Sequence, residues 1–238
     1  IAQHEKLLSE NIILGNGSNE ILELAARAFL NPGSSAVASA HAFVVYKIVT
    51  QSSGATLIEV PTLNWGHNLV EFPEHVRDDT KVIFIANPNN PTGTYNSHQE
   101  VYSLLKNIPS SILVVLDCAY FEYVKKSDYV NPLVLLNEFD NLIVTKSFSK
   151  IQGLASARIG YGIAQPDLIE VLNRIRQPFN VNSFAQELAC EAINDKEHIQ
   201  QSIDLNLSEG DFLFTELTQL GLECIPSVGN FISFKGNF

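Results

Sequence analysis

The segment KVIFIANPNNPTG, residues 81–93, places an unbroken apolar run directly before a turn rich in proline and asparagine. An apolar run without alternation is typical of a strand that is buried on both faces of a parallel sheet. The runs SILVVLD (111–117) and NLIVTKSF (141–148) have the same character, and the amphipathic segment SHQEVYSLLKNI (97–108) separates the first two. We therefore predict an α/β fold in three layers, with a doubly wound, mostly parallel sheet.

The alternation of strands and helices runs through most of the chain and then stops. After Gln165 the pattern is helical over 166–176 and 183–220, with a long helix from Glu197 to Leu220 that Gly221 ends. LECIP (222–226) and NFISF (230–234) resemble two strands of a smaller layer. We expect a large domain at 1–180, followed at 181–238 by connecting helices and the incomplete start of a small α+β domain.

Composition limits the classes of partner. The 238 residues are 45% hydrophobic and 17% charged, which is enough apolar material for a real core. The formal net charge of -11 has the wrong sign for binding nucleic acid or anionic lipid by bulk electrostatics. We expect small-molecule partners, with no nucleic acid and no membrane.

Cysteine and histidine usage favours a cytoplasmic protein without a metal. Cys118, Cys190 and Cys224 are far apart and predict neither a disulfide framework nor a zinc site. The histidines form no HxH or HxxH pair, and no apolar run has the length of a signal peptide or a membrane span. The chain begins at Ile1 and has no Met, so we expect a fragment, or a sequence from which modified residues are missing, and a domain that continues past Phe238.

Polar residues follow four of the predicted strands, where ligands gather in a doubly wound sheet. GNGSNE (15–20) has glycines that let backbone N–H groups approach a phosphate, with Ser18 or Asn19 as N-cap of the next helix. NPNNPTG (87–93) presents Asn89 or Asn90 to a pocket, and DCAYFEY (117–123) leaves Asp117 at a strand tip. Each pattern alone also fits an ordinary capped turn.

The fourth loop, TKSFSKIQGLASARIGYG (145–162), contains two candidate functional cations. Lys150 lies beside a buried strand end, and a desolvated lysine is the nucleophile that a Schiff-base enzyme needs. Arg158 lies in an apolar run and is expected to meet a buried anion, because its planar guanidinium suits phosphate or carboxylate. An amine, an acid and phosphate donors together are the protein groups that pyridoxal phosphate requires.

The motifs NPNNPTG, DCAY and SFSK, the last followed eight residues later by arginine, resemble the fold-type I pyridoxal-phosphate aminotransferases in order and separation. The resemblance covers essentially the whole chain. Within this group the segments LGNGSNE, NWGH, SKIQGLASARIGYG and PFNVNS are most similar to the histidinol-phosphate aminotransferases. It implies a homodimeric enzyme that moves an amino group between a donor such as histidinol phosphate, or an aromatic amino acid, and a 2-oxo acid such as 2-oxoglutarate.

The resemblance also implies roles for individual residues. Lys150 would form the Schiff base with pyridoxal phosphate, and Asp117 would pair with the pyridine nitrogen. Asn90 and Tyr120 would hydrogen-bond the phenolic oxygen of the cofactor, and Phe43 would stack on its ring. The phosphate would be held by Ser18, Asn19, Ser147, Ser149 and Arg158.

The sequence departs from the family in several places. Cys118 stands where the family has Glu, LASAR (154–158) replaces a segment like LAGLR, and the arginine for the substrate carboxylate is expected beyond Phe238. Arg174 and Arg176 are expected on a helix that leads away from the pocket, and Trp65 is expected to be a packing residue. The alternatives are a decarboxylase of the same fold and a ligand-sensing domain of a transcription regulator.

Overall fold

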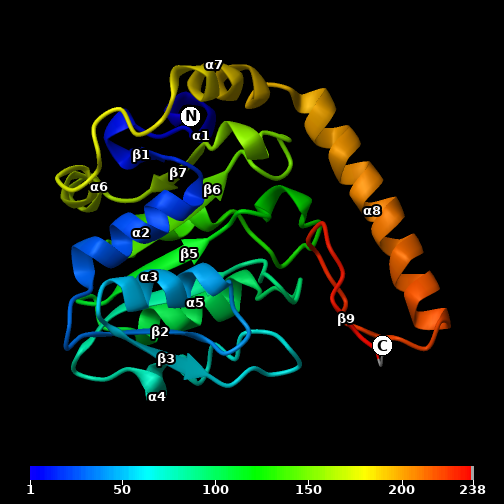
Figure 1. The fold of residues 1–238 in the computed structure, drawn as a ribbon, viewed down its shortest axis with the longest axis horizontal. Helices are drawn as coiled ribbons and strands as arrows, with labels where there is room; N and C mark the ends of the chain where they lie inside the picture. The colour runs from blue at the N-terminus through cyan, green and yellow to red at the C-terminus, as the bar shows by residue number, and fades with distance from the viewer. Residues whose placement is uncertain (237–238) are drawn as a thin grey trace.

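The computed structural model describes residues 1–236, and its centre is a seven-stranded sheet with helices packed on both faces (Figure 1). The strand order is β1-β7-β6-β5-β4-β2-β3. Phe238, where we expected a domain to continue, lies outside the described residues. The strands are β1 (Ile12–Gly15), β2 (Ser35–Ser39), β3 (Thr56–Val60), β4 (Thr80–Ala86), β5 (Leu113–Asp117), β6 (Leu142–Ser147) and β7 (Gly160–Ile163).

The sheet is mostly parallel, as predicted. The strands β3, β2, β4, β5 and β6 run parallel to one another, and β7 runs antiparallel to both β6 and β1. Asp117 pairs with Ala86 on one side and with Thr145 on the other. The carboxyl ends of β4, β5 and β6 therefore meet at one edge of the sheet, where the predicted loops also lie.

Two apolar cores form because successive strand residues point to opposite faces. In β5, Val114 and Leu116 pack into one core, and Val115 packs into the other. The first core includes apolar residues of α4 (Phe72–His75), α5 (His98–Asn107) and α7 (Ser183–Ala192). The second includes those of α2 (Ser18–Phe29), α3 (Val44–Ser52) and α6 (Pro166–Asn173).

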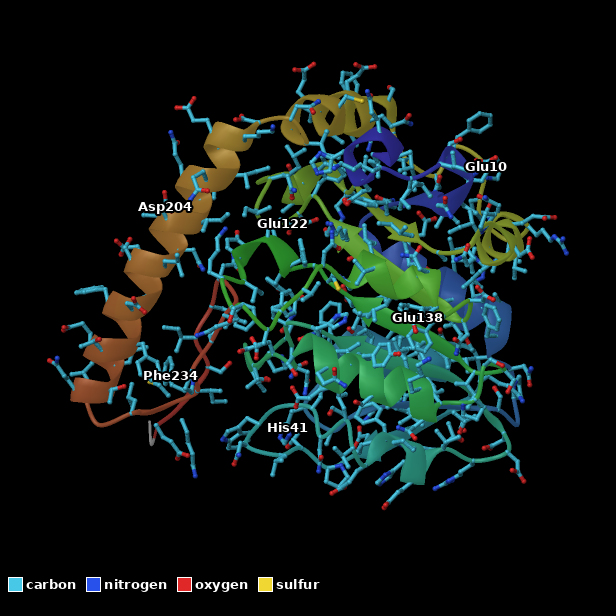
Figure 2. All side chains as sticks on the ribbon, turned by 180° about the vertical axis from the view of Figure 1, so that it is seen from behind. Glu10, His41, Glu122, Glu138, Asp204 and Phe234 are labelled. Carbon is cyan, nitrogen blue, oxygen red and sulfur yellow. The ribbon has the colours of Figure 1, made fainter. Side chains whose placement is uncertain are left out.

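The remaining elements lie around this framework. The helix α8 (Lys196–Gln219) extends beside the body of the molecule (Figure 1). Side chains project from it on the side away from the sheet (Figure 2). No helix within residues 1–236 combines the length and the apolar character needed to cross a membrane. The short elements are α1 (Ala2–Glu5), η1 (Ser9–Asn11), η2 (Phe121–Tyr123), η3 (Pro132–Asn137), η4 (Ala155–Ala157), β8 (Glu223–Cys224) and β9 (Phe234–Lys235).

The long helix predicted from Glu197 to Leu220 is confirmed as α8. It is separate from α7, because Asp195 caps it by accepting a hydrogen bond from the backbone N–H of His198. The two predicted strands are reduced to the antiparallel pair β8 and β9, each of two residues. The segment between them instead bonds to the 87–93 turn, where Val228 N–H donates to the carbonyl of Gly93.

Candidate active site

A cavity of about 170 Å³ lies at the carboxyl ends of β4, β5 and β6, beside the start of α2. Parallel strands and the helix N-terminus converge here, which is where open α/β sheets bind their ligands. All ten residues predicted as site residues line this one cavity, together with Ala86, Pro88 and Ala119. The ten are Ser18, Asn19, Phe43, Asn90, Asp117, Tyr120, Ser147, Ser149, Lys150 and Arg158.

Asp117 is a buried carboxylate at the end of β5, where it accepts three hydrogen bonds. The donors are the hydroxyl of Tyr46 at 3.2 Å, the hydroxyl of Thr145 at 3.0 Å and the backbone N–H of Ala119 at 3.3 Å. Burial raises the pKa of the Asp117 carboxyl, while these hydrogen bonds and the charge of Lys150 act in the opposite direction. The ion pairs within residues 1–236 do not include Asp117. A cation at its free edge would therefore stabilise the charged form.

Tyr46 was not predicted as part of the site. Its ring is stacked on Phe84 with centroids 5.0 Å apart, and Phe43 contacts it edge-on at 5.8 Å. Tyr46 follows Phe43 by three residues at the start of α3, so both side chains point to the same side. That spacing was the available signal, but the partner of Tyr46 lies 71 residues away.

Lys150 lies in a tight turn just after β6. The backbone N–H groups of Gly153 and Leu154 donate to the carbonyls of Lys150 and Phe148. On the outside, Nε2 of His198 on α8 lies 2.9 Å from the carbonyl oxygen of Ile151. The Lys150 ammonium lies 5.0 Å from the ring centroid of Tyr120, and both residues line the cavity, so the amine is placed at the cavity wall.

The 87–93 turn supplies one of its asparagines to the cavity. Asn90 lines the cavity, and its side-chain N–H donates to the hydroxyl of Tyr120 at 3.4 Å. Asn89 is fully buried instead, where its amide donates to the carbonyl of His41 and the hydroxyl of Thr92. Asn90 is thus the residue of this pair that can touch a ligand.

The prediction that Ser18 or Asn19 caps α2 is wrong. The N-cap is Gly17, with φ 76° and ψ 167°, and it makes no side-chain cap bond. This backbone conformation is open to glycine, and it brings the chain into the helix without using a side chain. The first-turn N–H groups and the hydroxyl of buried Ser18 consequently remain available at the cavity.

Arg158 lies directly over this turn. A Cβ built on Gly17 would approach Nη2 of Arg158 to 2.5 Å, so the guanidinium occupies the space that a side chain would need. Nη1 of Arg158 donates to the carbonyl of Ala155 at 2.9 Å and reaches the hydroxyl of Ser149 at 3.5 Å. Arg158 is exposed rather than buried, which corrects the expected environment, and the ion pairs found between residues 1 and 236 do not include it. A guanidinium without an acidic partner beside a helix N-terminus favours an anion.

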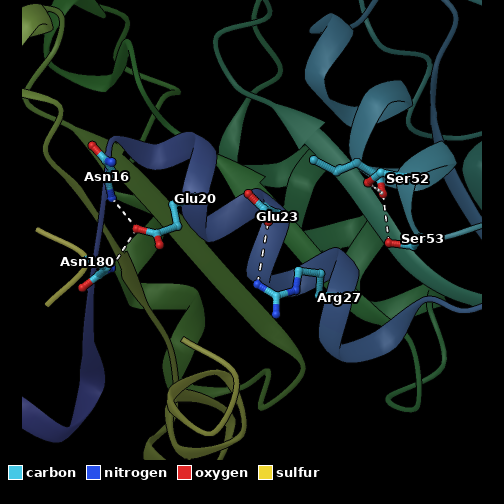
Figure 3. Close-up of polar contacts among 8 residues, drawn as sticks. Asn16, Glu20, Glu23, Arg27, Ser52, Ser53 and Asn180 are labelled. Atoms are coloured by element: carbon cyan, nitrogen blue, oxygen red, sulfur yellow. Dashed lines mark hydrogen bonds and ion pairs between the residues drawn. The ribbon is translucent and has the colours of Figure 1, made fainter. Parts of the chain in front are cut away.

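Glu20 fixes the same turn from the other side (Figure 3). Its carboxylate accepts from the backbone N–H of Asn16 at 2.6 Å and from the side chain of Asn180 at 2.7 Å. The Asn180 amide also donates to the carbonyl of Leu14 at 3.0 Å. The sequence does not predict this link, because the two segments are 160 residues apart. It ties the β1–α2 turn to the PFNVNS segment.

A buried ion pair lies beneath the site and was also missed. Nζ of Lys146 lies 2.9 Å from the carboxylate of Glu5, and both side chains are 6% exposed. The hydroxyl of Tyr161 donates to the same carboxylate at 2.8 Å. The pair joins α1 to β6, one residue before Ser147 of the cavity. Lys146 lies four residues before Lys150 in the segment 145–162, and nothing in the sequence indicates that it pairs with Glu5.

Other highlighted residues lie apart from the cavity lining. Trp65 is 43% exposed, with its ring edge on His41, and so is less of a packing residue than expected. Arg174 pairs with Glu170 at 2.6 Å, and Arg176 follows the end of α6 and bonds to Asn180. The part of the chain described here, 1–236, has no group of three or more His, Cys, Asp or Glu side chains that could hold a metal ion.

The sheet order and the cavity at the carboxyl ends of β4, β5 and β6 define a three-layer α/β fold with a ligand site at its strand ends. The chain belongs to the aminotransferase class I and II family, whose model matches residues 3–237. A solved structure of histidinol-phosphate aminotransferase from Sinorhizobium meliloti, in complex with pyridoxal-5'-phosphate, superposes with a TM-score of 0.92 at 27% identity. The match covers 98% of this chain and 63% of that one.

The chain is also similar in sequence to curated proteins that are named as aminotransferases. The chain is 50% identical over 224 residues to histidinol-phosphate aminotransferase 2 of Pseudomonas fluorescens, which covers 94% of the chain and 60% of that protein. It is 44% identical over 235 residues to histidinol-phosphate aminotransferase 1 of Dechloromonas aromatica, covering 99% of the chain and 65% of the relative. The chain thus spans less than two thirds of the length of these relatives.

Proposed function

We propose that the cavity binds pyridoxal phosphate and that the whole protein is a transaminase. The observation that carries this proposal is one cavity lined by a buried carboxylate, an amine and a guanidinium beside a helix N-terminus. Asp117, Lys150 and Arg158 supply these groups. The carboxylate suits a ring nitrogen that can be protonated, the amine suits an aldehyde, and the guanidinium suits a phosphate.

The phosphate end is supported by the geometry of the β1–α2 turn. The uncapped start of α2, the hydroxyl of Ser18 and the guanidinium of Arg158 all present donors to the same space. Asn19, Ser147 and Ser149 add further polar atoms there. A dianionic phosphate suits a site of this kind because the helix dipole and the guanidinium both favour negative charge.

The ring end is supported by the environment of Asp117. A buried acid whose pKa is raised by burial gains from a cationic partner, and a protonated pyridine nitrogen is such a partner. Asn90 and Tyr120, which bond to each other at 3.4 Å, would donate to the phenolic oxygen, and Phe43 would cover one face of the ring.

Lys150 would hold the cofactor through Nζ and, when the substrate amine takes its place, would move the proton at the substrate Cα. Bound pyridoxal phosphate supplies an electron sink that stabilises the charge left when this proton is removed. Asp117 would keep the ring nitrogen protonated, and the walls of the cavity would orient the substrate. We also propose that residues 1–180 form the cofactor-binding domain and that residues 181–238 form the connecting helices and the start of a small domain.

The amino donor we propose is histidinol phosphate, with 2-oxoglutarate as a 2-oxo acid acceptor. The support is the name of the curated relatives at 44% and 50% identity. We further propose a cytoplasmic homodimer. The free cysteines Cys118, Cys190 and Cys224 support a reducing compartment, and the exposed aromatic side chains of Phe179 and Phe184 support the dimer.

A spectral titration tests the proposal. Pyridoxal phosphate is added to residues 1–238, to a chain extended to the length of the relatives, and to Lys150→Ala variants of both. We expect the visible absorbance of lysine-bound cofactor in both parent chains and its loss in both variants, because only an amine can make the link. Lys47→Ala, which removes an exposed lysine on α3, is the matched control.

Turnover with histidinol phosphate and 2-oxoglutarate then separates the possible reactions. We expect glutamate from the extended chain and little from residues 1–238. Release of carbon dioxide without glutamate would favour the decarboxylase, and cofactor binding without either product would favour a sensor domain. Normal absorbance and turnover in Lys150→Ala would contradict the assignment of Lys150.

A further inference from the structure

The segment NWGH (64–67) contains a histidine that the proposed chemistry does not use. His67 is 5% exposed, and its Nε2 lies 2.8 Å from the carbonyl oxygen of Ala86, the last residue of β4. A carbonyl oxygen only accepts, so Nε2 carries the proton in this bond. Nδ1 is buried and has no hydrogen-bond partner among the described residues. The ring is held edge-on against Phe72.

The backbone of the same residue is bound to the other end of the turn. The side-chain amide of Asn96 donates to the carbonyl of His67 at 3.2 Å. Asn96 is paired with Asn87 by two bonds of 2.9 Å, from Asn87 Nδ2 to the Asn96 carbonyl and from Asn96 N–H to Asn87 Oδ1. His67 therefore bonds to both ends of the loop 87–96, to Ala86 through its ring and to Asn96 through its carbonyl.

Asn90 lies at the far side of this loop. Within the loop, Asn89 N–H donates to the carbonyl of Thr94 and Gly93 N–H donates to that of Asn89, both at 2.8 Å. The Asn90 side chain itself makes one long contact, 3.4 Å to Tyr120, so the backbone of the loop sets its place. Displacement of the loop base would move the Asn90 amide relative to Tyr120.

We propose that His67 is a positioning residue, which clamps the base of the loop 87–96 and thereby places the Asn90 amide at the cavity. The effect on the cofactor rests on the proposed function of Asn90. The clamp itself rests on the bonds to Ala86 and Asn96. The neutral ring fits this role, since burial lowers the pKa of His67 to about 4 and leaves Nε2–H as the donor at neutral pH.

The test compares three variants of the full-length protein. His67→Phe keeps a ring but removes the donor, and His67→Gln keeps an N–H donor in a similar position. His75→Phe is the matched control, because His75 lies eight residues on and its ring, among residues 1–236, bonds only to the carbonyl of Glu71, the N-cap of its own helix α4. Each variant is first shown to be folded by its circular dichroism.

The first measurement is hydrogen exchange at Asn89 and Gly93 in the protein without cofactor. We expect exchange to be about fivefold faster in His67→Phe, because one buried hydrogen bond is lost. In His67→Gln and His75→Phe we expect rates within about twofold of the wild type. Unchanged exchange in His67→Phe would overturn the clamp, whatever the cofactor does.

The second measurement is the pH titration of the absorbance of lysine-bound cofactor. We expect its apparent pKa in His67→Phe to move by about half a unit or more, in the same direction as in Asn90→Ala, with recovery in His67→Gln. A variant that loses stability while this titration stays unmoved would show that His67 is merely structural, and would overturn the positioning role. If the wild type itself bound no pyridoxal phosphate, the proposed function would fail, and hydrogen exchange alone would decide the clamp.

Discussion

Asp117 is a buried carboxylate that its neighbours hold in one position. Its carboxylate is held by Tyr46, Thr145 and the backbone of Ala119, and burial raises its pKa. The three donors fix the position of the side chain, and they leave one edge of it at the cavity. The position is thus set before a ligand binds, which is the condition for electrostatic stabilisation without reorganisation.

The first prediction concerns the variant Asp117→Asn. We expect cofactor occupancy to change little, because the phosphate donors remain, while the rate of Cα proton removal falls about 10²- to 10³-fold. The amide cannot hold the ring nitrogen in its protonated form. The measurement is loss of deuterium from the Cα of labelled substrate in the full-length enzyme. Thr145→Val, which removes one bond to Asp117, serves as the milder control, and an unchanged rate in Asp117→Asn would leave the residue with a structural role only.

The second prediction concerns His67 and acid stability. Its pKa is about 4 in the folded protein, against 6.5 for the ordinary side chain. The unfolded chain therefore takes up a proton on this residue as the pH falls below 6.5, while the folded protein does not until about pH 4. The stability due to neutral His67 is complete above pH 6.5, and about 3 kcal/mol of it is lost between pH 6.5 and 4.

Urea unfolding of the wild type and of His67→Gln over this pH range measures the loss. Carboxylates titrate in both proteins, so the difference between the two curves isolates His67. We expect that difference to shrink or reverse as the pH falls. Parallel curves would show that His67 does not stay neutral in the folded protein.

At the scale of elements, the β1–α2 turn depends on a glycine for two reasons. Gly17 has a φ of 76°, and a Cβ there would lie 2.5 Å from Nη2 of Arg158. Gly33 has a φ of 95° but no heavy atom within 4 Å of a Cβ, so it shares the backbone conformation without the close approach. Substitution of Gly33 therefore introduces backbone strain alone, whereas substitution of Gly17 introduces the same strain and also displaces the Arg158 guanidinium.

The third prediction follows from this pair. Both Gly17→Ala and Gly33→Ala should lower the free energy of unfolding by about 1 kcal/mol or more, because alanine is strained at positive φ. Only Gly17→Ala should weaken binding of pyridoxal phosphate, since it displaces Arg158. Titration with pyridoxal, which lacks the phosphate, is the check: its affinity should be equal in the two variants. Equal loss of both ligands in Gly17→Ala would mean that the turn does not bind the phosphate.

The elements that were predicted correctly are those whose signal is local. The strands β4 and β5 are apolar runs and β6 begins with one, and the polar residue at the tip of β5 or after β6 follows directly from where that run ends. The cap of α2 was wrong because Gly17 replaces side-chain capping by backbone geometry. Tyr46 on Asp117, Lys146 on Glu5 and Asn180 on Glu20 were not predicted, because nothing in the sequence marks pairs 71 or more residues apart.

At the scale of the whole molecule, the two halves of the chain differ in how they are covered. The central strands β5 and β6 are buried along their whole length, whereas Ile203 is the only buried residue of α8 within the described chain. The chain spans 60% of the length of one curated relative and 65% of the other.

Large apolar side chains are exposed on α7 and in the segment just before it. Phe179 is 97% exposed and Phe184 is 81% exposed, and Leu188 lies one helical turn after Phe184 on α7 and is 48% exposed. Large apolar side chains grouped on a surface mark an interface more often than chance placement does. In a two-fold dimer the same patch occurs on both subunits, so one substitution changes the interface twice.

The fourth prediction is that Phe184→Glu weakens the homodimer of the full-length protein. The substitution removes an aromatic ring from each side of an apolar interface and buries two carboxylates there, which should raise the dissociation constant roughly thirtyfold or more. Sedimentation at a series of protein concentrations measures the dissociation constant.

Because the chain already carries a net charge of -11, the added charge alone could favour dissociation. Asn107→Glu on α5, which adds the same charge at an exposed position, corrects for this effect. Equal dissociation constants for the two variants would place the interface elsewhere, and a monomeric wild type would refute the dimer.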